Sequence, residues 1–148
     1  LGFRNSQFFA AYARRLILHV RGNVTALPEN GQMLMEDMAD LGPDDLIFAV
    51  GLRRRTPTLT RTLALMHAHG VPIAYITDRR AVTTTKFARW VMPCHVRGTS
   101  SFDSYAGVVS LINFIGTRAS HRAGRDGRRR LGRIEDMLEA LGELDSSN

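Results

Sequence analysis

Two uncharged apolar runs, and the helix signals between them, constrain the fold of this chain more than any other feature. The runs are Leu46–Val50 (LIFAV) and Val71–Thr77 (VPIAYIT), and such continuous apolar runs are typical of strands covered on both faces. Thr56 followed by Pro57 predicts the start of a helix, and Gly70 predicts its end. Short strand–helix–strand connections favour parallel strands, and right-handed crossovers place helices on both faces. The sequence therefore predicts an α/β fold built on a doubly wound parallel sheet.

Further elements are expected on both sides of this unit. Leu1-Gly2 has the pattern of the last step of a strand that leads into a turn, so the first strand is expected to be truncated. Ser6 is a suitable N-cap for a helix that runs to about Arg21. Pro93 places the last strand at a sheet edge, because proline cannot donate to the ladder. The other expected elements are a short strand at 24–27, a helix at 30–41 with Met33, Leu34, Met38 and Leu41 facing inward, a helical turn at 84–89, the edge strand within 91–96, and a long helix from Ser101 to about Ser120.

Composition limits the class of protein. The chain has 148 residues, of which 44% are apolar and 23% charged, and this suits one domain with a hydrophobic core. The longest nearly uncharged apolar run, Val108–Gly116, falls short of the ~20 residues that cross a bilayer, and no signal peptide is recognised. A lone cysteine, Cys94, excludes an internal disulfide framework and a cysteine-based zinc cluster. We therefore expect a globular domain of the cytoplasmic type.

Charge is distributed unevenly towards the C-terminus. All but one of the 20 basic residues are arginine, whose guanidinium fork matches the oxygens of phosphate. Residues 118–133 hold seven arginines and one acid, whereas residues 134–148 hold five acids and no base. The Gly- and Arg-rich segment 121–133 is expected to be a solvated hinge that does not bind DNA. The chain is thus divided into a domain at 1–120 and a hinge with a C-terminal amphipathic helix at 121–148. The apolar stripe of that helix, expected to dock on the domain or on a partner subunit, is Leu131, Ile134, Leu138, Leu141 and Leu144.

The expected sheet also indicates where a ligand binds. Ligands of open α/β sheets lie outside the carboxyl ends of the strands, so a ligand site is expected among the loops that follow the strands. The helix that starts at Thr56 presents unpaired N–H groups and a positive dipole end at this edge, next to Arg53–Arg55. Thr56 either caps its helix and contacts an anion, or it caps only, with the arginines in a solvated turn.

Several segments, in their order along the chain, carry a resemblance to a known family. They are Gly2-Phe-Arg-Asn-Ser6, Gly51-Leu-Arg-Arg-Arg-Thr56, the strand region HGVPIAYITD and the helix region SFDSYAGVVSLINFIG. Together they resemble the SIS (sugar isomerase) domain, in particular the effector domain of RpiR-type transcriptional regulators. The resemblance covers residues 1–120 and implies a flavodoxin-like sandwich that binds a phosphorylated sugar.

The resemblance also implies partners and a set of site residues. An upstream helix-turn-helix domain would contact DNA, and the SIS domain would form a homodimer whose DNA binding responds to the effector. In this loop the family carries Ser-x-Ser-Gly-x-Thr, whereas this chain carries Gly51-Leu-Arg53-Arg54-Arg55-Thr56. The three arginines either grip a more highly charged ligand or fill the pocket. The implied ligand-binding residues are Gly2, Ser6, Gly51, Arg53, Arg55, Thr56, Ser100, Ser101 and Ser104.

Two alternatives stay open at this point. A phosphosugar isomerase needs a general base near the last strand–helix junction, and only Asp103 lies there, where it is expected to be an acid in the first helical turn. A degenerate SIS module would keep the fold for dimerisation only. No catalytic residue, cofactor or metal is predicted, because His67 and His69 diverge on a helix and Cys94 and His95 point to opposite faces of a strand.

Overall fold

A parallel sheet forms the centre of the molecule. The computed structural model describes residues 1–99 and 101–142. Its strands are β1 (Ile47–Gly51), β2 (Ile73–Asp78) and β3 (Trp90–Cys94), in the order β1-β2-β3. All pairings are parallel, with Tyr75 of β2 opposite Ala49 of β1 and Val91 of β3. Gly2 forms a parallel bridge with Val50, so Leu1-Gly2 lies beside β1 as the last step of a strand would.

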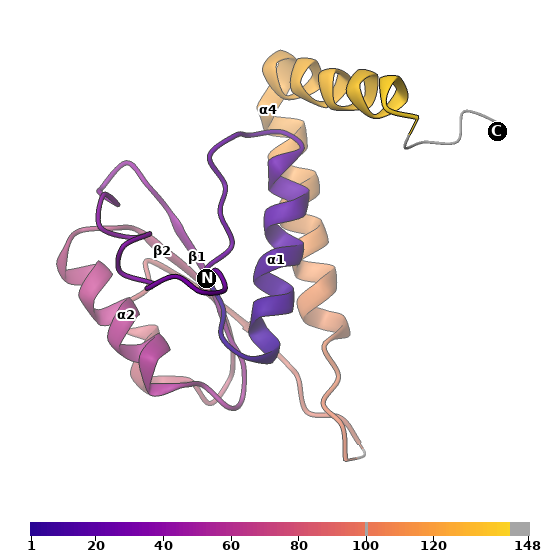
Figure 1. Cartoon of the computed structure of the whole chain (residues 1–148). Helices are drawn as coiled ribbons and strands as arrows, with labels where there is room; N and C mark the ends of the chain where they lie inside the picture. Colours follow the sequence, from indigo (N-terminus) through magenta and orange to yellow (C-terminus); the bar gives the residue numbers. More distant parts are fainter. Residues whose placement is uncertain (100, 143–148) are drawn as a thin grey trace.

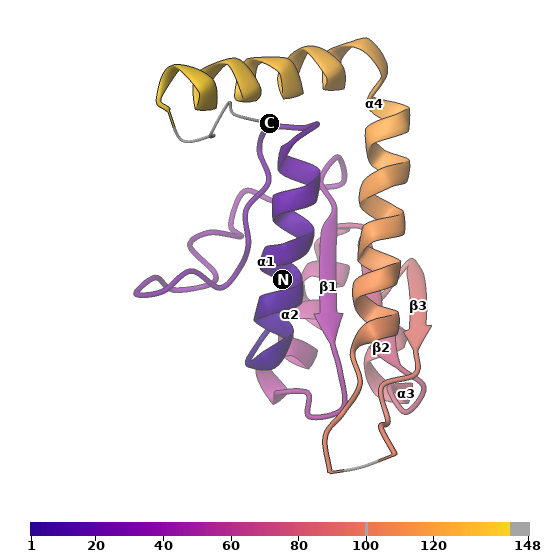
Figure 2. The same cartoon turned by 90° about the vertical axis from the view of Figure 1, so that its right-hand side faces the viewer.

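Helices cover both faces of this sheet, which confirms the doubly wound α/β fold (Figures 1 and 2). Helices α1 (Asn5–Leu18) and α4 (Ala106–Ala140) lie side by side on one face. Helix α2 (Pro57–Ala68) and the single turn α3 (Val82–Thr85) lie on the other. The end of β1 and the start of α2 therefore meet at the carboxyl edge of the sheet.

Two layers of apolar side chains hold the helices to the sheet. Tyr75 packs with Leu59 and Leu63 of α2 on one face, whereas the next residue, Ile76, packs with Val108 and Ile112 of α4 on the other. All six are at most 1% exposed, and burying a side chain of this size contributes about 1.5–3 kcal/mol. The alternation along β2 explains why its run is apolar throughout, since both faces are covered.

The predicted ends of α2 are confirmed. Thr56 is its N-cap, and the Thr56 hydroxyl accepts a hydrogen bond from the Leu59 N–H at 3.2 Å. Pro57 is the first helical residue, where its missing N–H is not needed. Gly70, just beyond the helix, takes the left-handed conformation at a φ of 78°. The β1–α2 unit thus follows directly from its sequence signals.

Helix α1 begins differently from the prediction. Ser6 lies inside the helix and does not cap it, because the N-cap residue is Arg4, at a φ of 54° and without a side-chain cap. The tight turn that precedes the helix is closed by the Ser6 N–H, which donates to the Phe3 carbonyl at 3.1 Å. The helix ends at Leu18, three residues before the expected end at Arg21.

Two predicted elements before β1 are absent from the structure. Residues 24–27 form no strand and residues 30–41 form only turns, with hydrogen bonds such as that from the Glu36 N–H to the Met33 carbonyl. A helix this short is marginal without tertiary packing, and Met33 is 72% exposed although it was expected to face inward. Met38 is buried as expected, and Leu34 and Leu41 are half-buried and pack against the same core, so these three residues hold the segment in place.

Helix α4 starts later and runs further than expected. It begins at Ala106, so Ser101 does not cap it, and Asp103 lies in the preceding loop instead of the first helical turn. The segment 121–133, where a hinge is predicted, is helical on both sides of Gly124. The non-helical backbone of Gly124 (φ 56°, ψ −135°) kinks the helix there, and its second half turns away from the first (Figure 1). The Arg130 guanidinium donates to the Leu18 carbonyl at 2.8 Å, which fixes this second half against the end of α1.

Strand β3 lies at the edge of the sheet, as Pro93 predicted. Within residues 1–99 and 101–142, no helix is both long and apolar enough to span a membrane. The positions of Ser100 and Leu144 lie outside the described residues.

Candidate functional site

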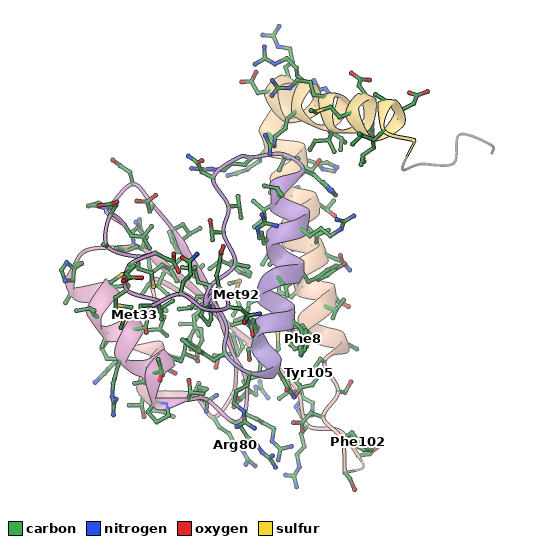
Figure 3. All side chains as sticks on the ribbon, in the orientation of Figure 1. Phe8, Met33, Arg80, Met92, Phe102 and Tyr105 are labelled. Carbon is green, nitrogen blue, oxygen red and sulfur yellow. The ribbon has the colours of Figure 1, made fainter. Side chains whose placement is uncertain are left out.

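Three loops converge on a small cleft at the carboxyl edge of the sheet. They are the turn before α1, the loop between β1 and α2, and the loop between β3 and α4. Figure 3 shows Tyr105 near the start of α1, with Arg80 and Phe102 towards the same end of the molecule. The cleft has a volume of about 100 Å³ and is lined by Phe3, Arg4, Asn5, Ser6, Phe9, Leu52, Arg53, Arg54, Asp103 and Tyr105.

The turn before α1 brings backbone and a hydroxyl to the cleft. A Cβ at Gly2 would collide with the Ser6 carbonyl, so only glycine permits this close approach. Ser6 is 7% exposed and lines the cleft, and the hydrogen bonds of the described residues include none from its hydroxyl. Arg4 holds a left-handed backbone conformation that glycine would adopt more readily. This turn is shaped by close packing at Gly2 and at the start of α1.

The loop after β1 is anchored at its base by Gly51. Its carbonyl accepts hydrogen bonds from the Thr77 hydroxyl at 2.8 Å and from the Tyr75 hydroxyl at 3.2 Å. A Cβ at Gly51 would overlap a Leu59 methyl group and approach the Tyr75 hydroxyl to 2.5 Å. Arg53 then turns the loop with a φ of 31°. A glycine at 51 is therefore required by packing.

Asp78, at the end of β2, organises the inner side of this loop. Its carboxylate accepts hydrogen bonds from the Arg53 N–H at 2.6 Å, from the Arg80 N–H at 2.8 Å and from the Arg55 guanidinium. Burial acts to raise the pKa of Asp78, but the hydrogen bonds from Arg80, Arg55 and Arg53 outweigh it and hold the pKa below its usual value. A charged carboxylate thus ties the β1–α2 loop to β2.

A second carboxylate closes the outer side. Asp103 pairs with the Arg53 guanidinium, and the Tyr105 hydroxyl donates to the same carboxylate at 3.4 Å. The ring of Tyr105 lies 5.0 Å from that of Phe9, which connects this loop to α1. The Arg53 and Asp103 side chains are 45% and 19% exposed, so this pair is open to water.

Comparison with known proteins decides the family. A family model, the SIS domain, matches residues 1–113, about three quarters of the chain. The chain belongs to the SIS domain family. The crystal structure of the sugar isomerase domain of an RpiR transcription factor from Sphaerobacter thermophilus is similar, with a TM-score of 0.81 and 23% identity over 91% of this chain and 75% of that one. A hypothetical protein of known structure matches with a TM-score of 0.55 and 14% identity, over 94% of this chain and 69% of that one. No curated protein matches.

Positive charge dominates the edge of this SIS domain that carries the cleft. Its arginines come from every loop that follows a strand, and two of them are paired with carboxylates, Arg55 with Asp78 and Arg53 with Asp103. Such an edge attracts anions, and it does so most strongly where the cleft limits access of water. The arginines with exposed side chains are Arg4, Arg53, Arg54, Arg79, Arg80 and Arg97.

The SIS fold brings some of the predicted site residues together and separates others. Ser6 and Arg53 line the cleft, while Gly2 and Gly51 shape its walls. Arg55 instead turns to Asp78 and Thr77.

Three other predicted hydroxyl residues, Thr56, Ser101 and Ser104, do not line the cleft. The hydroxyl of Thr56 caps α2, and Thr56 does not line the cleft. Ser101 and Ser104 are exposed and do not line it either, and Ser100 lies outside the described residues.

Sequence reasoning missed several residues of the site. Arg4 and Tyr105 line the cleft, and Asp78 holds the loop from beneath. Asp78 carried a usable signal, because an acid directly after a buried strand lies at the carboxyl edge. Over the described ranges 1–99 and 101–142, no group of three or more His, Cys, Asp or Glu side chains is arranged to hold a metal ion.

Proposed function

We propose that this SIS domain is the effector-binding domain of an RpiR-type transcriptional regulator. In this proposal a phosphorylated sugar or a similar anion binds in the carboxyl-edge cleft and controls DNA binding by an upstream helix-turn-helix domain. The observation that carries it is the meeting of Ser6, Arg4, Arg53 and Arg54 on one small cleft at the edge where α/β sheets bind ligands. The similarity to a regulator's sugar isomerase domain supports the same conclusion.

The chemistry of the cleft suits a phosphate group. Guanidinium groups of Arg53 and Arg54 offer paired N–H donors to phosphate oxygens, and charge-assisted hydrogen bonds of this kind are the strong ones. The Ser6 hydroxyl adds a neutral donor, and the rings of Phe3 and Phe9 offer apolar contacts to a sugar. Binding changes regulation only if the ligand prefers one of two arrangements of a homodimer, so we include a homodimer in the proposal.

A second candidate is a closed SIS module that keeps the fold only to form a dimer. The observation in its favour is that Arg53 and Arg55 are both paired with carboxylates of the same chain. A phosphosugar isomerase is less well supported. The hydrogen bonds that Asp78 accepts lower its pKa and disfavour its taking up a proton, and Asp103 is paired with Arg53. An aldose–ketose interconversion assay separates that activity from binding.

A thermal-shift panel tests the proposal. Inorganic phosphate, hexose phosphates and amino-sugar phosphates are added to the wild type, to Arg53→Gln and to Arg61→Gln, an exposed arginine of α2 outside the cleft. A ligand at 100 times its Kd stabilises the folded state by about 2.7 kcal/mol. We expect a selective shift in the wild type and in Arg61→Gln that Arg53→Gln loses. A flat panel on a folded protein would overturn the proposal in favour of the closed module.

A further inference from the structure

The Arg53–Asp103 pair crosses the cleft. Arg53 comes from the loop after β1 and Asp103 from the loop before α4, and both side chains line the cleft. Asp103 is the one acid among the lining residues, which include Arg4, Arg53 and Arg54. Its carboxylate therefore occupies the position on the Arg53 fork that a bound anion would take.

This pair can be exchanged at low cost. Close to half of the Arg53 side chain is exposed, and ion pairs open to water contribute little because both partners are well hydrated when apart. The other contact of Asp103 is a 3.4 Å hydrogen bond from Tyr105, long for a hydroxyl donor. Among the described residues, no other hydrogen bond or ion pair holds the Asp103 carboxylate in place.

We infer that Asp103 is an internal competitor for the anion site, so that a ligand binds by replacing the Asp103 carboxylate at Arg53. This inference rests on the proposed function. Because Asp103 belongs to the same chain as Arg53, its carboxylate has an effective concentration at Arg53 in the millimolar range. A ligand must bind more strongly than this carboxylate in order to replace it. A monocarboxylate offers Arg53 the same charge and geometry as Asp103, so replacing Asp103 with it gains little binding free energy. A phosphate monoester carries about −1.5 to −2 charges with three acceptor oxygens, and these can also bind Arg4 and Arg54. The cleft accordingly selects dianionic phosphate groups over carboxylates.

The exchange has a consequence for α4. Asp103 lies in the segment just before this helix, whose N-cap residue is Tyr105. The Ser104 N–H donates to the Val96 carbonyl at 3.0 Å, and the Tyr105 ring packs against Phe9, so Asp103 restrains this segment together with these contacts. Release of Asp103 loosens the start of α4 when the ligand binds.

The test compares two anions on three proteins. Inorganic phosphate and acetate are titrated by calorimetry into the wild type, Asp103→Asn and Asp44→Asn. Asp44→Asn makes the same change in net charge at an exposed residue that precedes β1, at the opposite end of the strand. We expect Asp103→Asn to bind phosphate about five-fold more tightly, a factor that corresponds to roughly 1 kcal/mol for the lost competitor. We also expect acetate to gain affinity by a similar factor, because Asp103 competes with either anion for Arg53, while Asp44→Asn stays within about two-fold of the wild type.

Failure of this inference and failure of the proposed function would give different results. If the wild type and Asp103→Asn bind phosphate equally well and Arg53→Gln does not bind it, the competition by Asp103 is wrong. The anion site at Arg53 would still be supported. No phosphate binding in any variant would overturn both. A second measurement needs no variant: in the wild type, saturating phosphate should speed amide hydrogen exchange in residues 104–108. Unchanged or slower exchange there would contradict the release of Asp103.

Discussion

Two arginines of the β1–α2 loop each pair with an aspartate, and the two pairs differ in their exposure to water. Arg55 pairs with Asp78, and their side chains are 18% and 6% exposed. Arg53 pairs with Asp103, and theirs are 45% and 19% exposed. The chemistry is the same, but one pair is enclosed between strand and loop while the other spans an open cleft. Burial therefore divides two arginines, two positions apart, into one that holds the fold and one that is available to a ligand.

The enclosed pair is also the better satisfied. Asp78 accepts from two backbone N–H groups besides Arg55, and a buried carboxylate with several donors remains charged. Removing one partner of a buried pair leaves the other unpaired, which costs more than the pair contributes. The open pair lacks this penalty, because water replaces the lost partner.

The largest effect is expected from Asp78→Ala. It leaves Arg55 and the Arg53 and Arg80 N–H groups without an acceptor, and we expect the free energy of unfolding to fall by about 3 kcal/mol. Urea denaturation measures it, and Asp103→Ala is the matched control, with an expected loss below about 1 kcal/mol. Equal losses in the two variants would show that the two pairs do not differ in role.

Stability should also depend on pH through Asp78. Its pKa is lowered in the folded state, so its contribution is complete above the unfolded value of about 3.9 and is lost as pH falls through the lower folded pKa. At pH values below about 4, we expect the urea concentration at the unfolding midpoint to decrease in the wild type and in Asp103→Asn. It should decrease less in Asp78→Asn. An identical acid profile for Asp78→Asn and the wild type would assign the acid sensitivity to other groups.

The two arginines should separate stability from binding. Arg55→Gln removes a donor from a buried carboxylate, and we expect a loss of about 1–2 kcal/mol in unfolding free energy. Arg53→Gln should cost less than about 1 kcal/mol and yet abolish the response to phosphate. Parallel urea and calorimetric titrations test this, and a stable Arg55→Gln that no longer binds phosphate would reverse the assignment.

A smaller effect is expected at the end of the same loop. Thr56→Ala removes the hydroxyl that caps α2, and loss of a cap typically costs about 1 kcal/mol. Phosphate affinity should stay unchanged, because Thr56 does not line the cleft. Thr58→Ala, at an exposed position in the first turn of α2, serves as the control for the loss of a hydroxyl. Weaker phosphate binding by Thr56→Ala alone would extend the site to the start of α2.

The elements with strong local signals could be predicted from the sequence. The β1–α2–β2 unit follows from two apolar runs and from the Thr56–Pro57 and Gly70 signals, all of which act within a few residues. The segment 30–41 misled the prediction, because a helical spacing of methionines does not reveal whether a surface exists to bury them.

The start of α4 was missed for a different physical reason. Ser101 is a good cap by type, but the loop before Ala106 is shaped by long-range contacts of Asp103, Ser104 and Tyr105. The candidate site could be predicted in part. Its location at the carboxyl edge of the sheet and the presence of Arg53 there follow from the topology. The pairing of Arg53 with Asp103 does not, because it joins residues 50 positions apart in the sequence. Such pairings are properties of the folded chain.

The most direct test follows each guanidinium by NMR during a titration with inorganic phosphate. The Nε–Hε resonances of Arg53 and Arg55 are assigned by comparison with Arg53→Gln and Arg55→Gln. We predict that phosphate shifts the Arg53 resonance in a saturable manner and leaves that of Arg55 in place, because only the open pair exchanges its partner. A shift of Arg55 without Arg53, or no saturable shift of either, would contradict the division between a structural and a ligand-binding arginine.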